Sequence, residues 1–132
     1  MTRLSVDALA KALDRLDEGF AEAARYPGLL TIRDGVIHRF ELAMDLAWML
    51  LRRALRDRFQ IDDSELLSKK DVFRQAARTQ VLDDAERWLG HYEARNQTSH
   101  VYDSDEAARA FERAREFLVD GRVVLERLRD GA

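Results

Sequence analysis

The sequence contains no cysteine and only one proline and six glycines in 132 residues. Without cysteine, disulfide bonds and thiolate metal sites are excluded, and this agrees with a reducing compartment. Scarce proline and glycine favour long helices joined by few turns. No sustained alternation of apolar and polar residues and no Asn-Gly turn marks a strand or hairpin. These absences predict an all-α protein.

Long apolar runs and an excess of one charge are also absent. No run approaches the ~18 apolar residues of a membrane span, and no basic-then-apolar leader opens the chain. We therefore expect a cytoplasmic protein with no membrane association. The net charge of −3 does not indicate a nucleic-acid-binding protein. It does not exclude one either, because a local patch of basic residues matters more for binding than the net charge of the chain. The length is that of one domain, so we expect a single domain over residues 1–132.

Apolar residues recur at helical spacing in the first half of the chain. A first helix is predicted by the apolar face Leu9, Leu13, Leu16 and Phe20. It should end at the Tyr-Pro-Gly segment 26–28. A second helix is predicted from about Thr31 to Arg58. Its apolar stripe is so wide that the helix is either central in the bundle or half buried in a dimer contact. That stripe comprises Ile37, Phe40, Leu42, Met44, Leu46, Trp48, Met49, Leu50, Leu51 and Leu55.

The second half predicts three further helices, two of them short. Residues 59–67 form a polar connection, and Ser68 is a candidate N-cap for a short helix. Another helix begins near Asp83. The last begins after Asp103, where Glu106 three residues later makes a variant of the capping box. We therefore predict an up-and-down helical bundle of four to five helices.

The segment between the fourth and last predicted helices is dense in groups that handle phosphate or protons. Arg95 offers a planar fork suited to bidentate phosphate contact, and His100 can exchange a proton near neutral pH. Additional hydrogen-bonding groups come from Asn96, Thr98, Ser99 and Tyr102. Arg95 should lie in the last turn of its helix and His100 in the turn or at the start of the next. Structural roles are equally compatible with these residues, because Arg95 could cap helix carbonyls and Tyr102 could be a packing residue.

The spacing Arg95-x4-His100-x-Tyr102 has the R-x4-H-x-Y form of the HEPN motif. The wider segment 95–103, with the sequence RNQTSHVYD, resembles the signature of the nucleotidyltransferase substrate-binding protein family within the HEPN superfamily. Stretches 39–48 and 70–88 resemble the family's central, third and fourth helices, so the likeness extends from about Leu9 to Leu128. One position differs from the family pattern: Met49 lies directly after Trp48, where many relatives have a lysine. Any partner or ligand contact that this lysine makes in relatives is not expected in this protein.

The resemblance implies a homodimer with both motif segments near the interface, and a minimal nucleotidyltransferase as partner. It also implies a metal-independent endoribonuclease without cofactor, often the toxin of a toxin–antitoxin pair. His100 would assist proton transfer at a ribose 2′-hydroxyl, Arg95 would stabilise charge on the phosphate, and Asn96 would position one of them. Tyr102 resembles a tyrosine that the partner modifies with AMP in related pairs.

The alternative implied by the same resemblance is a non-catalytic subunit. In that case the polar cluster, with Ser99 and Tyr102, holds a nucleotide or substrate group on which the partner acts. Growth arrest on expression without the partner would support the toxin, and its absence the subunit.

Other candidate sites have weaker support. Asp34 and His38, and Glu41 and Asp45, share helical spacing that can bind metal inside a bundle, but the Glu-x-x-His pattern is absent. His91 precedes Arg95 by one turn, and we expect it to be a solvated surface residue. Two tryptophans, Trp48 and Trp88, are expected in the core. The arginines at 52, 53, 56 and 58 are expected to form a solvated face, which in a dimer could supply a basic surface.

Overall fold

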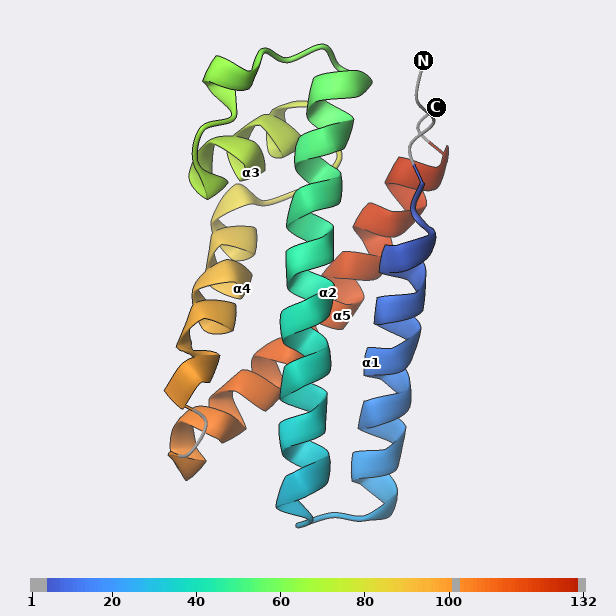
Figure 1. Ribbon diagram of the computed structural model, residues 1–132, viewed down its shortest axis with the longest axis vertical. Coiled ribbons are helices and arrows are strands. Elements are labelled where there is room, and N and C mark those ends of the chain that lie inside the picture. Colours follow the sequence, from blue (N-terminus) through green and yellow to red (C-terminus); the bar gives the residue numbers. More distant parts are fainter. Residues whose placement is uncertain (1–4, 101–102, 131–132) are drawn as a thin grey trace.

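The computed structural model describes residues 5–100 and 103–130, and this part of the chain is helical without a strand. Five α-helices and two short 3-10 helices follow one another along the chain (Figure 1). They are α1 (Asp7–Arg25), α2 (Leu30–Asp57), η1 (Asp63–Glu65), α3 (Lys69–Arg78), α4 (Ala85–Gln97), η2 (Thr98–His100) and α5 (Ser104–Asp130). The prediction of an all-α bundle is confirmed.

The four longer helices run alternately up and down (Figure 1). Helices α1 and α2 form an antiparallel hairpin, α4 lies on the other side of α2, and α5 crosses obliquely behind α2. Helix α2 contacts all four other α-helices, so it is the central element. Within the described ranges, no helix is long and apolar enough to cross a membrane.

Helices α3 and α5 begin at the capping residues that the sequence predicts. The Ser68 hydroxyl accepts a hydrogen bond from the Asp71 N–H at 3.1 Å, and the Asp71 carboxylate accepts one from the Ser68 N–H at 3.3 Å. This is a complete capping box. Before α5, the Asp103 carboxylate accepts from the N–H groups of Asp105 and Glu106. At the α1–α2 turn, Gly28 has a φ of 90°, a left-handed conformation that glycine adopts without steric cost.

Aromatic side chains from three helices meet at the centre of the core. Phe40 of α2 and Trp88 of α4 both pack edge-on against Phe117 of α5, with ring centroids 5.3 Å and 5.7 Å apart. Phe40 and Phe117 are fully buried, and Trp88 is nearly so, which confirms its predicted core position. Trp48 is only half-buried, so its prediction as a core residue is correct only in part.

The wide apolar stripe of α2 is not fully covered by the rest of the chain. Leu42 and Met49 remain 51% and 53% exposed, although α2 is central. Both lie on the outward face of the helix, together with Asp45. The central position that the sequence offered as one alternative is therefore confirmed, and two large apolar side chains still face outward.

Candidate functional site

The described part of the motif segment, residues 95–100, forms a corner at the end of α4. Arg95 lies in the last turn of α4, as predicted, and the chain then tightens into the 3-10 helix η2. The Thr98 N–H donates to the Arg95 carbonyl, which closes the end of α4. Residues 98–100 therefore follow Arg95 directly around one corner of the bundle.

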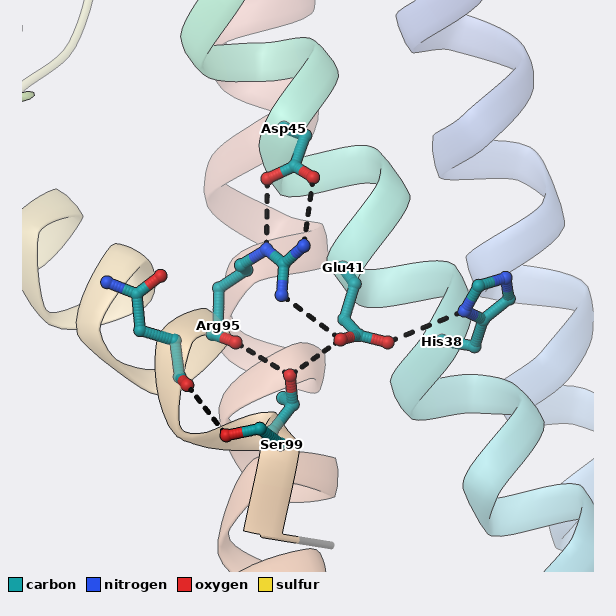
Figure 2. Close-up of polar contacts among 7 residues, drawn as sticks. His38, Glu41, Asp45, Arg95 and Ser99 are labelled. Carbon is teal, nitrogen blue, oxygen red and sulfur yellow. Dashed lines mark hydrogen bonds and ion pairs between the residues drawn. The ribbon is translucent and has the colours of Figure 1, made fainter.

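Two carboxylates of α2 hold the Arg95 guanidinium from the side (Figure 2). Its Nε and Nη2 donate to the two oxygens of Asp45 at 3.0 Å and 3.1 Å, a bidentate pair. Its Nη1 donates to Oε2 of Glu41 at 3.1 Å. The hydrogen bonds to Asp45 are the main reason that the pKa of Arg95 is raised. The guanidinium is thereby charged and fixed in orientation.

Among the described residues, the Arg95 guanidinium has fewer partners than it has N–H groups. A guanidinium has five N–H donors, and three hydrogen bonds to carboxylates are formed here. The Arg95 side chain is 28% exposed. Two of the five N–H groups therefore have no hydrogen-bond partner among residues 5–100 and 103–130.

Thr98 fastens the corner to α2. Its side chain is buried, and its hydroxyl oxygen lies 2.7 Å from Oε2 of Glu41 and 2.6 Å from the Arg95 carbonyl oxygen. The single hydroxyl proton is donated to one of these two acceptors at a time. The Glu41 carboxylate thus binds both Arg95 and Thr98, and it sets the position of η2 relative to the guanidinium (Figure 2).

The remaining predicted site residues lie on the outer side of this corner or outside the described residues. Asn96 and Ser99 are exposed, and the Ser99 hydroxyl donates to the Asn96 carbonyl at 3.5 Å. The Asn96 side chain forms no hydrogen bond within residues 5–100 and 103–130. His100 ends η2, but its side chain is not among those described, and Tyr102 lies outside the described residues.

Glu41 and Asp45 have a role that the sequence did not reveal. Their one-turn spacing suggested metal ligands, but both carboxylates bind Arg95. His38 is mostly exposed, with Nδ1 3.4 Å from Oε1 of Glu41. In the described part of the chain, no group of three or more His, Cys, Asp or Glu side chains could hold a metal ion.

His91 was predicted to be a solvated surface residue, and that prediction is wrong. The side chain is fully buried, with the rings of Trp88 and Phe117 packed edge-on against it. Arg113 Nε donates to Nδ1 at 2.9 Å, and Nε2 lies 2.6 Å from a carboxylate oxygen of Asp120. These contacts favour the neutral tautomer with the proton on Nε2. Burial is the main cause of a lowered pKa for His91, and the neighbouring Arg113 adds to it.

His91 and Arg95 therefore serve different contacts, although they lie one turn apart. The partners of His91 are on α5, whereas the carboxylates that bind Arg95 are on α2. His91 stabilises the packing of α4 on α5. The motif cluster consists of Arg95, Thr98, Glu41 and Asp45.

Comparisons with known proteins agree on one family. Residues 4–130 match the family model for nucleotidyltransferase substrate binding protein like proteins. A Haemophilus influenzae protein named "Probable ribonuclease HepT" is 32% identical over 100 residues, which span 75% of this chain and 68% of that protein.

Two solved structures share the fold. One, from Haemophilus influenzae, is described as revealing the fold of a substrate binding domain of a nucleotidyltransferase. It superimposes with a TM-score of 0.85 at 27% identity, covering 96% of this chain and all of that one. The other, from Thermus thermophilus, has a TM-score of 0.80 at 31% identity and covers 92% and 98% of the two chains.

Proposed function

The chain belongs to the family of nucleotidyltransferase substrate binding protein like proteins, and from this membership we propose that it is a metal-independent endoribonuclease restrained by a minimal nucleotidyltransferase. The two proteins would act as toxin and antitoxin. The relative named as a ribonuclease supports the activity, and the family supports the partner.

The observation that carries this proposal is the orientation of Arg95. A charged guanidinium, fixed by two carboxylates and still partly exposed, lies at the corner that leads directly to His100. Such a preorganised cation stabilises negative charge that develops on a phosphate, because it does not have to reorient during the reaction.

In the proposed reaction, His100 accepts the proton of a ribose 2′-hydroxyl as its oxygen attacks the adjacent phosphorus. Arg95 stabilises the charge on the phosphate oxygens. The bond from phosphorus to the 5′ oxygen then breaks, that oxygen takes a proton from a water molecule, and protonated His100 returns its proton to the solvent. The products are a 2′,3′-cyclic phosphate and a 5′-hydroxyl. Asn96, exposed beside Arg95, positions the substrate or one of the two reacting side chains.

We propose that the active form is a homodimer whose two-fold contact lies at Leu42 on α2, one helical turn N-terminal of Leu46 and away from Met49. Leu42 is 51% exposed and lies next to Glu41, which binds Arg95. A two-fold contact at Leu42 would bury this apolar side chain and bring the two motif corners to one composite cleft. AMP added to Tyr102 by the nucleotidyltransferase would then block the cleft.

Cleavage of a labelled RNA by the purified protein in the presence of a chelator tests the nuclease. We expect Arg95→Ala and His100→Ala each to slow cleavage by ~10²–10⁴-fold, the range of general acid–base assistance. Arg74→Ala is the matched control, because Arg74 is exposed on α3 and makes no ion pair within the described residues. Intact RNA with the wild-type protein, or full activity of both variants, would overturn the proposal.

A second function has its own support. The relative solved from Haemophilus influenzae is described as a substrate binding domain of a nucleotidyltransferase. A net charge of −3 also provides no overall excess of cations for phosphate contacts. In this alternative the motif cluster holds a nucleotide or substrate group for the partner without cleaving it. Expression without the partner distinguishes the two, since only the nuclease arrests growth, and the His100→Ala variant relieves that arrest.

A further inference from the structure

A basic hollow lies on α2 beyond the motif cluster. It has a volume of about 280 Å³ and is lined by Trp48, Met49, Arg52, Arg53 and Arg56. Three of these five residues are arginines, in a protein whose net charge is −3. From the sequence we expected a solvated face here that could supply a basic surface in a dimer, and the structure places Arg52, Arg53 and Arg56 around one concave surface beside Trp48.

The cations of the basic hollow are weakly neutralised by the protein. Arg53 is exposed and has no ion pair within the described ranges. Within residues 5–100 and 103–130, Arg56 is paired only with its chain neighbour Asp57, and its side chain is 45% exposed. Arg52 reaches Asp63 and the Leu66 carbonyl at 3.4 Å, the outer limit of a hydrogen bond. A multiply charged anion would therefore find available donors in this hollow.

Trp48 adds a second, independent feature. Its indole N–H is buried and has no acceptor in the part of the chain that the structure describes. Native proteins seldom leave such a donor unsatisfied. The Lys69 ammonium lies 4.1 Å from the centre of the Trp48 ring and forms no ion pair among the described residues. Aromatic faces beside cations are the combination that single-stranded nucleic acids use, with phosphates on the cations and bases on the ring.

The basic hollow and the motif cluster lie on the same helix. Asp45, which binds Arg95, precedes Arg53 by eight residues, or ~12 Å along the helix axis. Both positions are exposed on α2. A strand of a few nucleotides with one phosphate at Arg95 would extend into the hollow.

We propose that the basic hollow binds phosphate groups of the same RNA strand whose cleavage is assigned to the motif, a few nucleotides from the cleaved bond. This rests on the proposed nuclease function and adds a substrate subsite to it. The hollow would determine how much single-stranded RNA must flank the cleaved bond, and it would supply the basic surface that the net charge conceals.

Binding of a fluorescent single-stranded RNA, measured by anisotropy over a range of salt concentrations, tests the proposal. A His100→Ala background prevents cleavage. The hollow variant carries Arg53→Gln and Arg56→Gln, and the matched control carries Arg15→Gln and Arg25→Gln, two exposed arginines of α1. Each phosphate contact to a single strand contributes ~0.7 to the slope of log K against log salt. We therefore expect the slope of the hollow variant to shrink by ~1.4, with affinity about 25-fold lower at 0.1 M salt.

Several results would overturn the proposal: an unchanged slope in the hollow variant, the same loss in the control, or competition by polyglutamate as strong as that by RNA. ATP binding that requires the hollow, without RNA binding, would assign it to a free nucleotide instead. Equal melting temperatures of both variants ensure that folding is not the cause.

Cleavage of the same RNA by protein with His100 intact is measured separately. A smaller salt slope in the hollow variant without any RNA cleavage by the wild type would support the binding subsite and refute the nuclease proposal. RNA cleavage by the wild type together with an unchanged salt slope in the hollow variant would support the nuclease proposal and refute the subsite.

Discussion

Replacing His91 should remove the part of the acid-induced loss in the free energy of unfolding that comes from protonation of this side chain. His91 is fully buried between Trp88 and Phe117, and its pKa is lowered chiefly by burial. The unfolded chain, in which histidine has a pKa of about 6.5, therefore binds more protons below that pH than the folded protein does. As a result, the free energy of unfolding falls as the pH decreases below about 6.5.

The size of this loss follows from linkage. It approaches about 1.4 kcal/mol for each pH unit below the unfolded pKa and stops at the folded pKa. Between pH 7.5 and 5.5, His91 therefore removes at most about 1.4 kcal/mol. His91→Gln eliminates this proton uptake. It also weakens the bonds to Arg113 and Asp120, so its stability at pH 7.5 should be lower by about 1–3 kcal/mol.

Urea denaturation followed by circular dichroism at the two pH values measures both effects. The difference in the free energy of unfolding between wild type and variant should become smaller by up to about 1.4 kcal/mol from pH 7.5 to pH 5.5. The reason is that only the wild type is destabilised by proton uptake at His91 in the unfolded chain. His38→Gln is the matched control, since His38 is mostly exposed. A gap between wild type and the His91 variant that is the same at both pH values would refute the reasoning.

Three other predictions concern the cap, the motif cluster and the outward face. Ser68→Ala should lower the free energy of unfolding by about 1 kcal/mol, because the Asp71 N–H loses its acceptor; no change in urea denaturation would contradict the cap. A double-mutant cycle of Glu41→Gln and Arg95→Gln, measured as the free energy of unfolding, should give a coupling energy of about 1–2 kcal/mol, since the pair is about three-quarters buried. Additive effects of the two substitutions on that free energy would contradict a stabilising Glu41–Arg95 pair. Leu42→Glu should convert the proposed dimer to a monomer in analytical ultracentrifugation. A variant with the same molecular mass as the wild-type protein would show that Leu42 is not part of a dimer contact.

Much of the architecture was predictable because local signals agree with the fold. The apolar face of α1 consists of residues that the structure buries, and the ends of α1 and α2 lie within one residue of the turn chemistry at 26–28 and the predicted stop. The cap at Ser68 was predicted from its type and position. These features depend on neighbours in sequence, so a single chain contains the information.

The contacts of the polar side chains were not predictable in the same way. His91 follows Trp88 by three residues, and this spacing places it on the buried face of α4, but its partners Arg113 and Asp120 come from α5. Both flank the core residue Phe117 at helical spacing, which is the signal that could have revealed the network. Spacing alone gives the face of a helix; the crossing of another helix determines what that face meets.

The motif cluster shows the same limit. Glu41 and Asp45 had the spacing of ligands on one helix face, and the ligand that they bind is a guanidinium from a segment 50 or more residues away. The sequence marked Arg95 and the pair of acids separately. Only the side-by-side arrangement of α2 and α4 joins them (Figure 1).

The oblique course of α5 has a consequence for how the protein forms during synthesis. Among the described helices α5 leaves the ribosome last, and it provides Phe117 to the centre of the core and Arg122 to ion pairs with Asp14 and Asp17 on α1. A nascent chain can close the α1–α2 hairpin early, but it cannot enclose His91 or Phe40 until α5 has emerged. The core is therefore completed only after α5 has been synthesised, and until then the apolar faces of the α1–α2 hairpin and of α4 stay partly exposed.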